Sequence, residues 1–525
     1  MKNTSISVGA TPSLPPLKHP WSRCITVGRA YELLRADLQE HLRELRRDFG
    51  YRHIRFHASF HDDVKVVQKL PNGEIVYRWT QLDHIYDFLV EAGFDPIVEI
   101  NPMPAVLASG EKTMFWYKMN ATPPAEMKEW ERFMRAYILH TVERYGIERV
   151  RNWKFEVWNE PDLHGQFWTG DQQAYFDLYA ACARVLKEVD PCLEVGGPAT
   201  AGWTWALDLA AWCREKVVPL DFISYHCYPQ NEACTYHGAE DCPYVPGMFF
   251  IQQVKRAKQE LREAGFGDLP ILMTEWNSLA ASGEGKARWV GNETINNLFA
   301  GAAVCHLVTG CDEDLDIMGW WVASDVFEEG GPQVEPYSRR YQHYGMLTID
   351  GLPKSSYHAF RFLNRLRGKR YEVHPGGKAD RHLGCIVTDE LAATRCLVWN
   401  TVFPDMEGAD WTFTLPIPVS KSHVDAPSVR VTVAHVKEGR GSAWEFWIEM
   451  GEPAVLTRIE QEALAVRALP DCSSRMMKVV NGAVEVSLTL KPNEFALIEL
   501  GGAPEGGGIE HTAEEKALDA ALDGG

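Results

Sequence analysis

Short apolar runs alternate with longer stretches of helical periodicity between about residues 25 and 325. Residues 29–49 place Leu34, Leu38, Leu42, Leu45 and Phe49 on one helical stripe, and the short apolar run 54–57 follows. This order is typical of repeated βα units with a parallel sheet. With an opening run near Ile25, the predicted strands are 54–57, 96–101, 153–158, 193–196, 222–228, 269–275 and 317–322. These eight strands predict a (β/α)₈ barrel.

Two further stretches have the spacing of helices that pack on a sheet. Residues 126–145 carry apolar side chains at helical intervals, with prolines before them and Gly146 after them as stop signals. Residues 354–367 predict the last helix of the barrel. The stripe over 126–145 is more typical of core packing than of ligand binding.

The periodicity changes to two between Tyr371 and Leu500. Residues 483–490 and 495–500 alternate on either side of Pro492 and Asn493, and 411–415 and 429–433 predict further short strands. We therefore expect a small antiparallel β-sandwich over 367–500, after a catalytic barrel over 23–366. Residues 501–525 are glycine-rich and then acidic, which predicts a flexible tail.

Composition supports a soluble protein of this size. A barrel takes about 250 residues, so a chain of 525 residues leaves room for a second domain. The formal charge of −19 comes with no basic tract of the kind that nucleic acid or anionic lipid requires. We expect neither a nucleic-acid nor a membrane partner, and a neutral or cationic ligand is favoured.

The first 16 residues lack a signal-peptide pattern, and no run of about 18 apolar residues occurs, so a cytoplasmic location is expected. The 12 cysteines form no CxxC pair, which argues against structural zinc and a dense disulfide framework. Cys234, His237 and Cys242 share one polar loop, but their spacing fits no standard metal site. No metal or organic cofactor is expected.

The strongest chemical motif is the stretch 155–162, FEVWNEPD, where an apolar strand ends in Asn159, Glu160 and Pro161. In a barrel, the carboxyl ends of the strands hold the active site. Glu160 there could protonate a glycosidic oxygen while Asn159 holds a sugar hydroxyl. The alternative is that Glu160 only caps the following helix.

The second motif is the stretch 271–277 (ILMTEWN), where another apolar strand ends in Glu275 and Trp276 follows. Taken alone, Glu275 could be a turn carboxylate. A retaining glycosidase needs two carboxyl groups, one that donates a proton and one that stays ionised and attacks. The pair therefore predicts a retaining glycosidase with its carboxyl groups about 5 Å apart.

These motifs resemble those of the barrel-glycosidase clan with the acid/base after the fourth strand and the nucleophile after the seventh. More narrowly, the chain resembles glycoside hydrolase family 39, the family of β-xylosidases and α-L-iduronidases. The similar stretches are 28–30, 54–63 (IRFHASFHDD), 155–162, 226–229 (HCYP), 274–277, 324–329 (SDVFEE) and 347–360. The resemblance implies that residues 1–22 join the β-sandwich.

The resemblance also implies roles for single residues. Glu160 would be the acid/base, Glu275 the nucleophile, and Asn159 the partner of the sugar 2-hydroxyl. The remaining matches to the sugar pocket are His57, His226, Tyr228 and Glu328, with Glu329 as the alternative to Glu328. Trp320 and Trp321 could stack on the sugar, with Trp321 the first choice, although core packing explains them equally well.

After Pro336 the sequence departs from the xylosidase pattern and carries Arg339 and Arg340. An arginine near the sugar could bind a uronic carboxylate, although a surface location is the more common explanation. The sequence thus predicts an exo-acting β-xylosidase on short oligosaccharides. The alternatives are an α-L-arabinofuranosidase, a β-glucosidase, a uronidase, or a carbohydrate-binding barrel without turnover. A homo-oligomer is compatible with the sequence.

Overall fold

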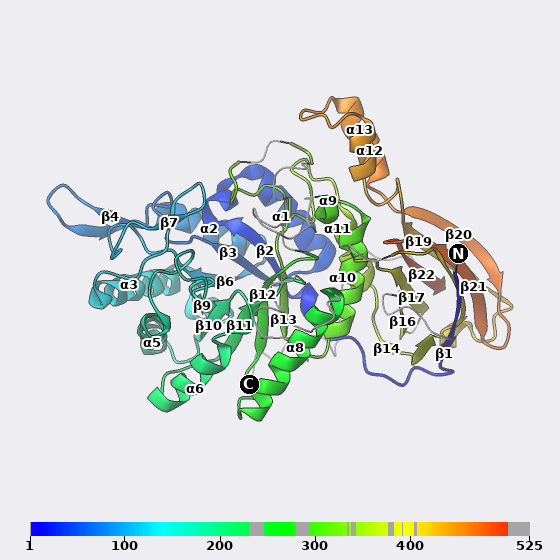
Figure 1. Ribbon diagram of the computed structural model, residues 1–525, viewed down its shortest axis with the longest axis horizontal. Coiled ribbons are helices and arrows are strands. Elements are labelled where there is room, and N and C mark those ends of the chain that lie inside the picture. Colours follow the sequence, from blue (N-terminus) through cyan, green and yellow to red (C-terminus); the bar gives the residue numbers. More distant parts are fainter. Residues whose placement is uncertain are drawn as a thin grey trace.

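The computed structural model describes residues 2–229, 246–279, 293–332, 335–337, 343–375, 383–390, 392–403 and 407–501. Eight parallel strands close into a barrel in chain order (Figure 1), which confirms the predicted fold class. They are β2 (Cys24–Arg29), β3 (His53–His57), β6 (Asp95–Ile100), β9 (Lys154–Val157), β10 (Glu194–Thr200), β11 (Phe222–His226), β12 (Ile271–Trp276) and β13 (Ile317–Trp320).

Helices surround the barrel and pack apolar side chains against it, and α10 and α11 are buried over most of their surface (Figure 1). They are α1 (Ala36–Phe49), α2 (Thr80–Glu91), α3 (Met127–Tyr145), α5 (Gln172–Val189), α6 (Ala206–Lys216), α8 (Pro246–Glu263), α10 (Leu298–Cys311) and α11 (Ser355–Leu363), with the short α4 (Ile147–Val150) and α9 (Glu293–Asn296) between them. The helix predicted from Arg29 is shorter than expected, because Arg29 ends β2 and the chain passes through the 3₁₀ turn Ala30–Leu34 before α1.

The C-terminal part is a two-sheet sandwich. One sheet has the order β15-β1-β18-β21 and the other β14-β16-β17-β22-β19-β20, and their facing apolar side chains form a separate core. The strands are β1 (Lys2–Val8), β14 (Lys369–Arg370), β15 (Val373–Pro375), β16 (Leu383–Glu390), β17 (Ala393–Asn400), β18 (Trp411–Pro418), β19 (Ser428–Val436), β20 (Asp471–Lys478), β21 (Ala483–Leu490) and β22 (Phe495–Gly501). The consecutive strands β21 and β22 lie in opposite sheets.

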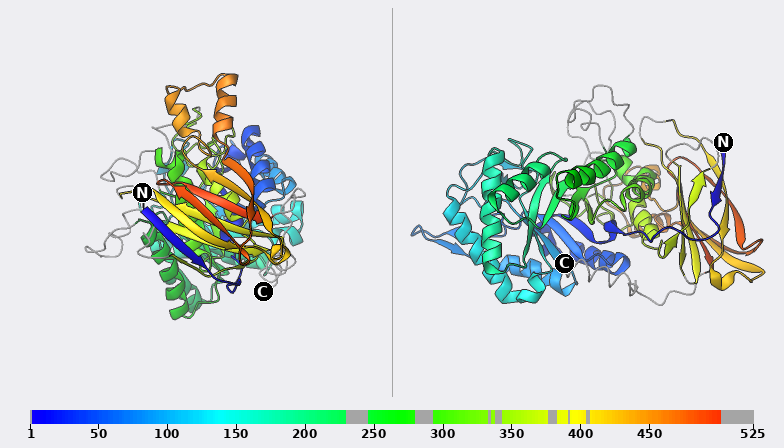
Figure 2. Two further views of the ribbon diagram at one scale, coloured as in Figure 1. Left: turned by 90° about the vertical axis from the view of Figure 1, so that its right-hand side faces the viewer. Right: turned by 90° about the horizontal axis from the view of Figure 1, so that it is seen from below.

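The apolar core of the barrel extends to one sheet of the sandwich. Phe495 and Leu497 of β22 belong to the same buried cluster as the barrel helices. Gly301 of α10 lies against the Phe495 ring, where a Cβ would come within 2.6 Å of that ring and of the backbone oxygen of Ser355. Figure 2 shows the two parts side by side, with the chain running from β1 in the sandwich to the barrel. The sandwich thus rests on the outside of the barrel.

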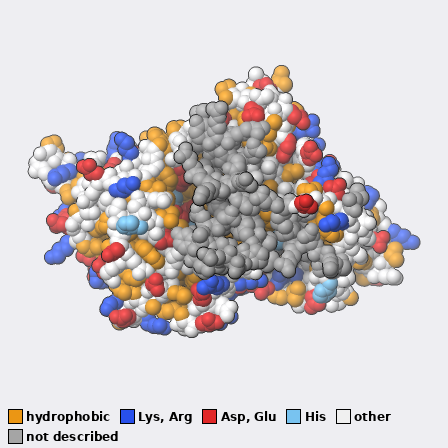
Figure 3. Space-filling view, viewed as in Figure 1, with side chains coloured by type: hydrophobic (Ala, Val, Ile, Leu, Met, Phe, Trp, Pro, Cys, Tyr) orange, Lys and Arg blue, Asp and Glu red, His pale blue; other side chains and the backbone are white. Residues whose placement is uncertain are grey.

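Two short helices, α12 (Trp444–Glu449) and α13 (Arg458–Arg467), project from the sandwich between β19 and β20 (Figure 1). Acidic and basic side chains are interspersed over the described part of the face in Figure 3. Within the described ranges, no helix combines the length and apolar character that a membrane crossing requires. Cys234, His237, Cys242, Arg339, Arg340 and the tail from 502 onward lie outside the described residues.

Candidate active site

Glu160 and Glu275 meet at the carboxyl end of the barrel. Glu275 lies within β12, and Glu160 follows β9, where the backbone turns sharply. Trp158 and Glu160 have positive φ values of 70° and 44°, a strained conformation typical of functional sites. The Glu160 amide donates to the Ala199 oxygen at 2.8 Å, which ties the turn to the end of β10.

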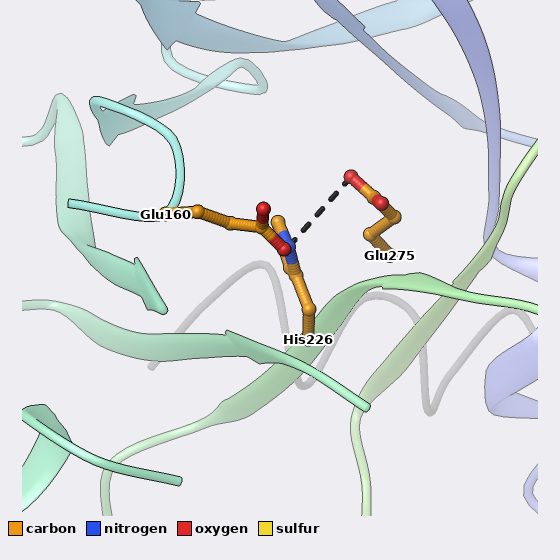
Figure 4. A group of neighbouring side chains, drawn as sticks. All are labelled: Glu160, His226 and Glu275. Atoms are coloured by element: carbon orange, nitrogen blue, oxygen red, sulfur yellow. Dashed lines mark hydrogen bonds and ion pairs between the residues drawn. The ribbon is translucent and has the colours of Figure 1, made fainter. Parts of the chain in front are cut away.

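The two carboxyl groups are close together, with a histidine beside them. One oxygen of Glu160, one nitrogen of His226 and one oxygen of Glu275 all lie within 4.8 Å of one another (Figure 4). Retaining glycosidases have carboxyl groups about 5–5.5 Å apart, whereas inverting enzymes leave about 6.5–9.5 Å for a water molecule. The arrangement is therefore that of a retaining enzyme.

Arg55, on β3, lies beneath this pair and is completely buried. Its guanidinium donates to Glu156 at 2.6 Å and to the Asn159 Oδ1 at 2.8 Å. It also lies 2.8 Å from the Glu99 carboxylate and 3.5 Å from Glu275 Oε2. A buried guanidinium requires several acceptors to compensate for its lost hydration, and here those acceptors include active-site residues.

His226 bridges the pair and is neutral. Its Nδ1 lies 2.9 Å from Glu160 Oε1 and 3.6 Å from Glu275 Oε2. Burial lowers the pKa of the His226 imidazole to about 4. The hydroxyl of Tyr228 donates to Glu275 Oε1, and burial raises the pKa of that phenol well above its usual value. Glu275 therefore accepts a hydrogen bond from a neutral donor.

Glu160 is nearly buried, with 9% of its surface exposed. Burial, with a smaller opposing effect of the Arg55 charge, raises the pKa of its carboxyl group to about 8. Because this value lies above neutrality, Glu160 carries a proton at pH 7. The environment thus makes it a proton donor.

Asn159 has one end fixed and the other free for a ligand. Its Oδ1 accepts from Arg55, while its buried Nδ2 has no hydrogen-bond partner within the described part of the chain. A buried amide without a partner is costly, so this group is a candidate donor to a substrate hydroxyl.

His57 also lies close to Glu275. Its Nδ1 bonds to the Glu99 carboxylate at 2.7 Å, and its Nε2 lies 3.9 Å from Glu275 Oε2. Burial lowers the pKa of His57 to about 3, so the ring is neutral. The Trp321 ring packs against the His57 ring, with the two ring centres 4.7 Å apart. In contrast, Trp320 packs between Trp276 and Phe360 in the core, so it belongs to the barrel interior.

Glu328 and Glu329 follow β13 and point to different partners. From the sequence we expected Glu328 to face the sugar. Glu328 accepts two hydrogen bonds from Arg29, at 2.8 and 3.1 Å, and lies 3.6 Å from Arg35. Glu329 instead lies 3.7 Å from His57 Nε2. Burial, together with the charge of Glu275, raises the pKa of Glu329 well above its usual value. The structure thus brings Glu329, the second choice, to the carboxylate pair and not Glu328.

Arg55, Glu99 and Glu156 received no role from the sequence. Each is a charged residue on a barrel strand between apolar neighbours, and each is completely buried. That placement is itself a signal, because buried charges are rare unless they are paired. Alternation along β3 also places Arg55 on the same side of the strand as His57.

Glu160, His226 and Glu275 are of the types that bind metal ions. The Arg55 guanidinium, however, lies 3.3 Å from the second nitrogen of His226 and 3.5 Å from Glu275. This fixed positive charge disfavours a divalent cation at the same position. The group is better suited to hold an organic ligand.

Comparison with known proteins agrees with this geometry. A family model described as Glycosyl hydrolases family 39 matches residues 4–484. A "Beta-xylosidase" of Geobacillus stearothermophilus is 32% identical over 518 residues, 97% of this chain and 96% of the relative. A "Beta-xylosidase" of Caldicellulosiruptor saccharolyticus is 34% identical, covering 85% of this chain and 87% of the relative. The solved structure of a monomeric β-xylosidase from Caulobacter crescentus CB15 superimposes with a TM-score of 0.81 at 27% identity, covering 96% of this chain and 100% of that one.

Proposed function

Since the chain belongs to glycoside hydrolase family 39, we propose that this glycosidase is an exo-acting β-xylosidase that releases xylose from short xylo-oligosaccharides with retention of configuration. The observation that carries the proposal is the similarity to two β-xylosidases along nearly the whole of both chains. The separation of Glu160 and Glu275, within 4.8 Å, supports the retaining course.

In the first step, Glu275 attacks the anomeric carbon while Glu160 protonates the departing oxygen. The hydrogen bond from Tyr228 and the nearby Arg55 guanidinium hold the Glu275 carboxylate in one orientation. A covalent glycosyl-enzyme results, and the leaving group departs with the proton of Glu160.

In the second step, Glu160 acts as the base. Glycosylation removes the negative charge of Glu275, so the ionised form of Glu160 is no longer opposed by that charge. Glu160 then takes a proton from water, which attacks the anomeric carbon and releases the sugar with its original configuration.

The sugar that is cleaved from its partner, here called the glycone, lies over Glu275 in this proposal. Asn159 Nδ2 donates to its 2-hydroxyl, which gives that buried amide its missing acceptor. His57 lies near both Glu275 and Glu329, and in this proposal His57 and Glu329 bind hydroxyls further along the ring. Trp321, packed against His57, is a candidate for contact with the ring face.

The charges around the site favour a neutral glycone over a uronic acid. Arg55 is paired with Glu99 and Glu156, and Arg29 with Glu328 and Asp63. In the portion of the chain described by the structure, the arginines nearest Glu275 therefore already have carboxylate partners. Among the described residues, a substrate carboxylate would face the acidic groups Glu275 and Glu329, and the arginines near them are already paired.

A panel of 4-nitrophenyl glycosides tests the proposal. We expect the β-D-xyloside to have the highest kcat/KM among the β-xyloside, α-L-arabinofuranoside, β-glucoside and iduronide substrates. Proton NMR during the first minutes should show β-xylose before mutarotation. A preference for another sugar would refute the xyloside assignment, and an initial α-product would refute retention.

A further inference from the structure

A two-stranded hairpin stands beside the active site. It is formed by β7 (Thr113–Met114) and β8 (Met119–Asn120) in the segment that joins β6 to α3. Phe115 and Lys118, at the ends of its four-residue tip, have positive φ values of 57° and 61°. Such a conformation is unfavourable for a residue other than glycine, so tertiary contacts must hold the tip in place.

Trp116, at this tip, makes the contact that joins the hairpin to the active site. Its indole N–H donates to the backbone oxygen of Glu328 in the segment after β13. The Arg29 guanidinium lies 4.5 Å from the centre of the Tyr117 ring and 5.7 Å from that of Trp116. The indole is nevertheless 47% exposed. It is thus held from several sides and still presents a large apolar face.

A series of contacts connects the Trp116 indole with the two catalytic carboxyl groups. His226 joins Glu160 to Glu275, at 2.9 and 3.6 Å. His57 Nε2 lies 3.9 Å from the Glu275 carboxylate and 3.7 Å from Glu329.

The residue before Glu329 is Glu328, whose carbonyl holds Trp116. Glu160 must lie at the scissile oxygen in order to protonate it. Trp116 thus contacts the segment that carries Glu329, and this contact is the basis for placing the indole at the end of the glycone away from Glu160.

We propose that Trp116 closes the non-reducing end of the glycone pocket and thereby limits the enzyme to removing one xylosyl unit at a time. The inference rests on the proposed β-xylosidase function and deepens it. A second xylosyl unit linked to the 4-hydroxyl of the glycone would have to occupy the space of the indole. Because the indole is fixed by its hydrogen bond to Glu328 and by its packing near Arg29, it cannot move aside at low cost.

The test uses 4-nitrophenyl β-xylobioside and measures xylose, xylobiose and nitrophenol together. The unaltered enzyme should release xylose first, and nitrophenol should appear only after a lag, without xylobiose. In Trp116→Ala, nitrophenol and xylobiose should appear together without a lag. We expect the initial xylobiose-to-xylose ratio to rise by about tenfold or more, which corresponds to removal of a penalty of about 1.4 kcal/mol.

Two further variants keep the experiment decisive. Trp116→Leu retains an apolar side chain next to Tyr117 and is used if Trp116→Ala fails to fold. It should raise the initial xylobiose-to-xylose ratio by less than Trp116→Ala does. Trp212→Ala removes a half-buried tryptophan from α6, on the outside of the barrel, and should leave the product ratio unchanged. A rise in that control as well would show that the effect is not specific to Trp116.

The outcomes separate this inference from the proposed function. If the folded Trp116 variants still give xylose alone with the same lag, the inference is wrong while the β-xylosidase assignment stands. A variant that only raises KM for xylobiose, with an unchanged product ratio, would assign Trp116 to the leaving-group side and also overturn the inference. If the unaltered enzyme does not cleave 4-nitrophenyl β-xyloside at all, the proposed function itself fails.

Discussion

The Nδ1 atom of His226 lies 2.9 Å from Oε1 of Glu160. The other ring nitrogen, Nε2, lies 3.3 Å from the Arg55 guanidinium, which can only donate. Nε2 is therefore the acceptor, and a neutral His226 carries its proton on Nδ1. That N–H donates to Oε1 of Glu160, which leaves Oε2 to hold the proton that Glu160 delivers to the substrate.

The separate roles of the two glutamates can be tested by chemical rescue. Glu275→Ala should abolish turnover, and azide should restore it with an inverted glycosyl azide, because the anion occupies the vacated space beside the anomeric carbon. Glu160→Ala should lose about 10²–10⁴-fold on substrates with poor leaving groups, retain activity on activated ones, and yield a retained azide product. NMR distinguishes the inverted from the retained glycosyl azide. If Glu275→Ala gave the retained azide and Glu160→Ala the inverted one, the roles of the two glutamates would be reversed.

The pH dependence of kcat/KM should have an alkaline limb governed by Glu160. Burial raises the pKa of this carboxyl group to about 8; below that pH it is protonated and can act as the acid, and above it the donor is lost. Glu160→Gln should remove the alkaline limb for an activated nitrophenyl substrate, provided that formation of the glycosyl-enzyme limits kcat/KM. Survival of the limb in that variant would show that a different group titrates there.

A buried ion pair supports the segment that carries Glu329. Lys354 Nζ lies 2.6 Å from Asp325 Oδ2, and neither side chain is exposed. Asp325→Ala should lower the free energy of unfolding by about 3–5 kcal/mol, because it leaves a buried ammonium without its partner. Chemical denaturation measures the loss. As a control, Glu462→Ala breaks the exposed pair with Arg458 and should leave the denaturation midpoint unchanged. Equal losses in Asp325→Ala and Glu462→Ala would show that the buried pair has no special importance for stability.

The contact between barrel and sandwich depends on the absence of a side chain at Gly301. An added Cβ would lie 2.6 Å from the backbone oxygen of Ser355 and from the Phe495 ring. Gly301→Ala should destabilise the protein by about 1–3 kcal/mol through overpacking, seen as a lower thermal midpoint. Gly202→Ala, where the nearest atom would be 3.9 Å away, is the matched control. A stable Gly301→Ala protein would mean that α10 can move away from β22 at little cost.

The sequence by itself determined the barrel, the sandwich and the positions of the two glutamates at the barrel mouth. Periodicity of hydrophobic residues sets which strands are buried on both faces, and the carboxyl ends of parallel strands converge at one edge. An apolar strand that stops at Glu160 or contains Glu275 near its end therefore already places these residues close together. The same periodicity locates the helices and strands but not their exact ends: the helix expected from Arg29, for example, begins at Ala36.

Only the tertiary structure decided which side chains complete the site. Glu328 and Glu329 are neighbours in an irregular segment, and their directions depend on the position of Arg29 and His57, which lie about 300 residues earlier in the chain. The placements of Arg55 beneath Glu275 and of Trp116 against Glu328 likewise join segments that are distant in sequence. Local pattern carries no information on such contacts, because they form only when the barrel closes and brings strands that are distant in sequence together.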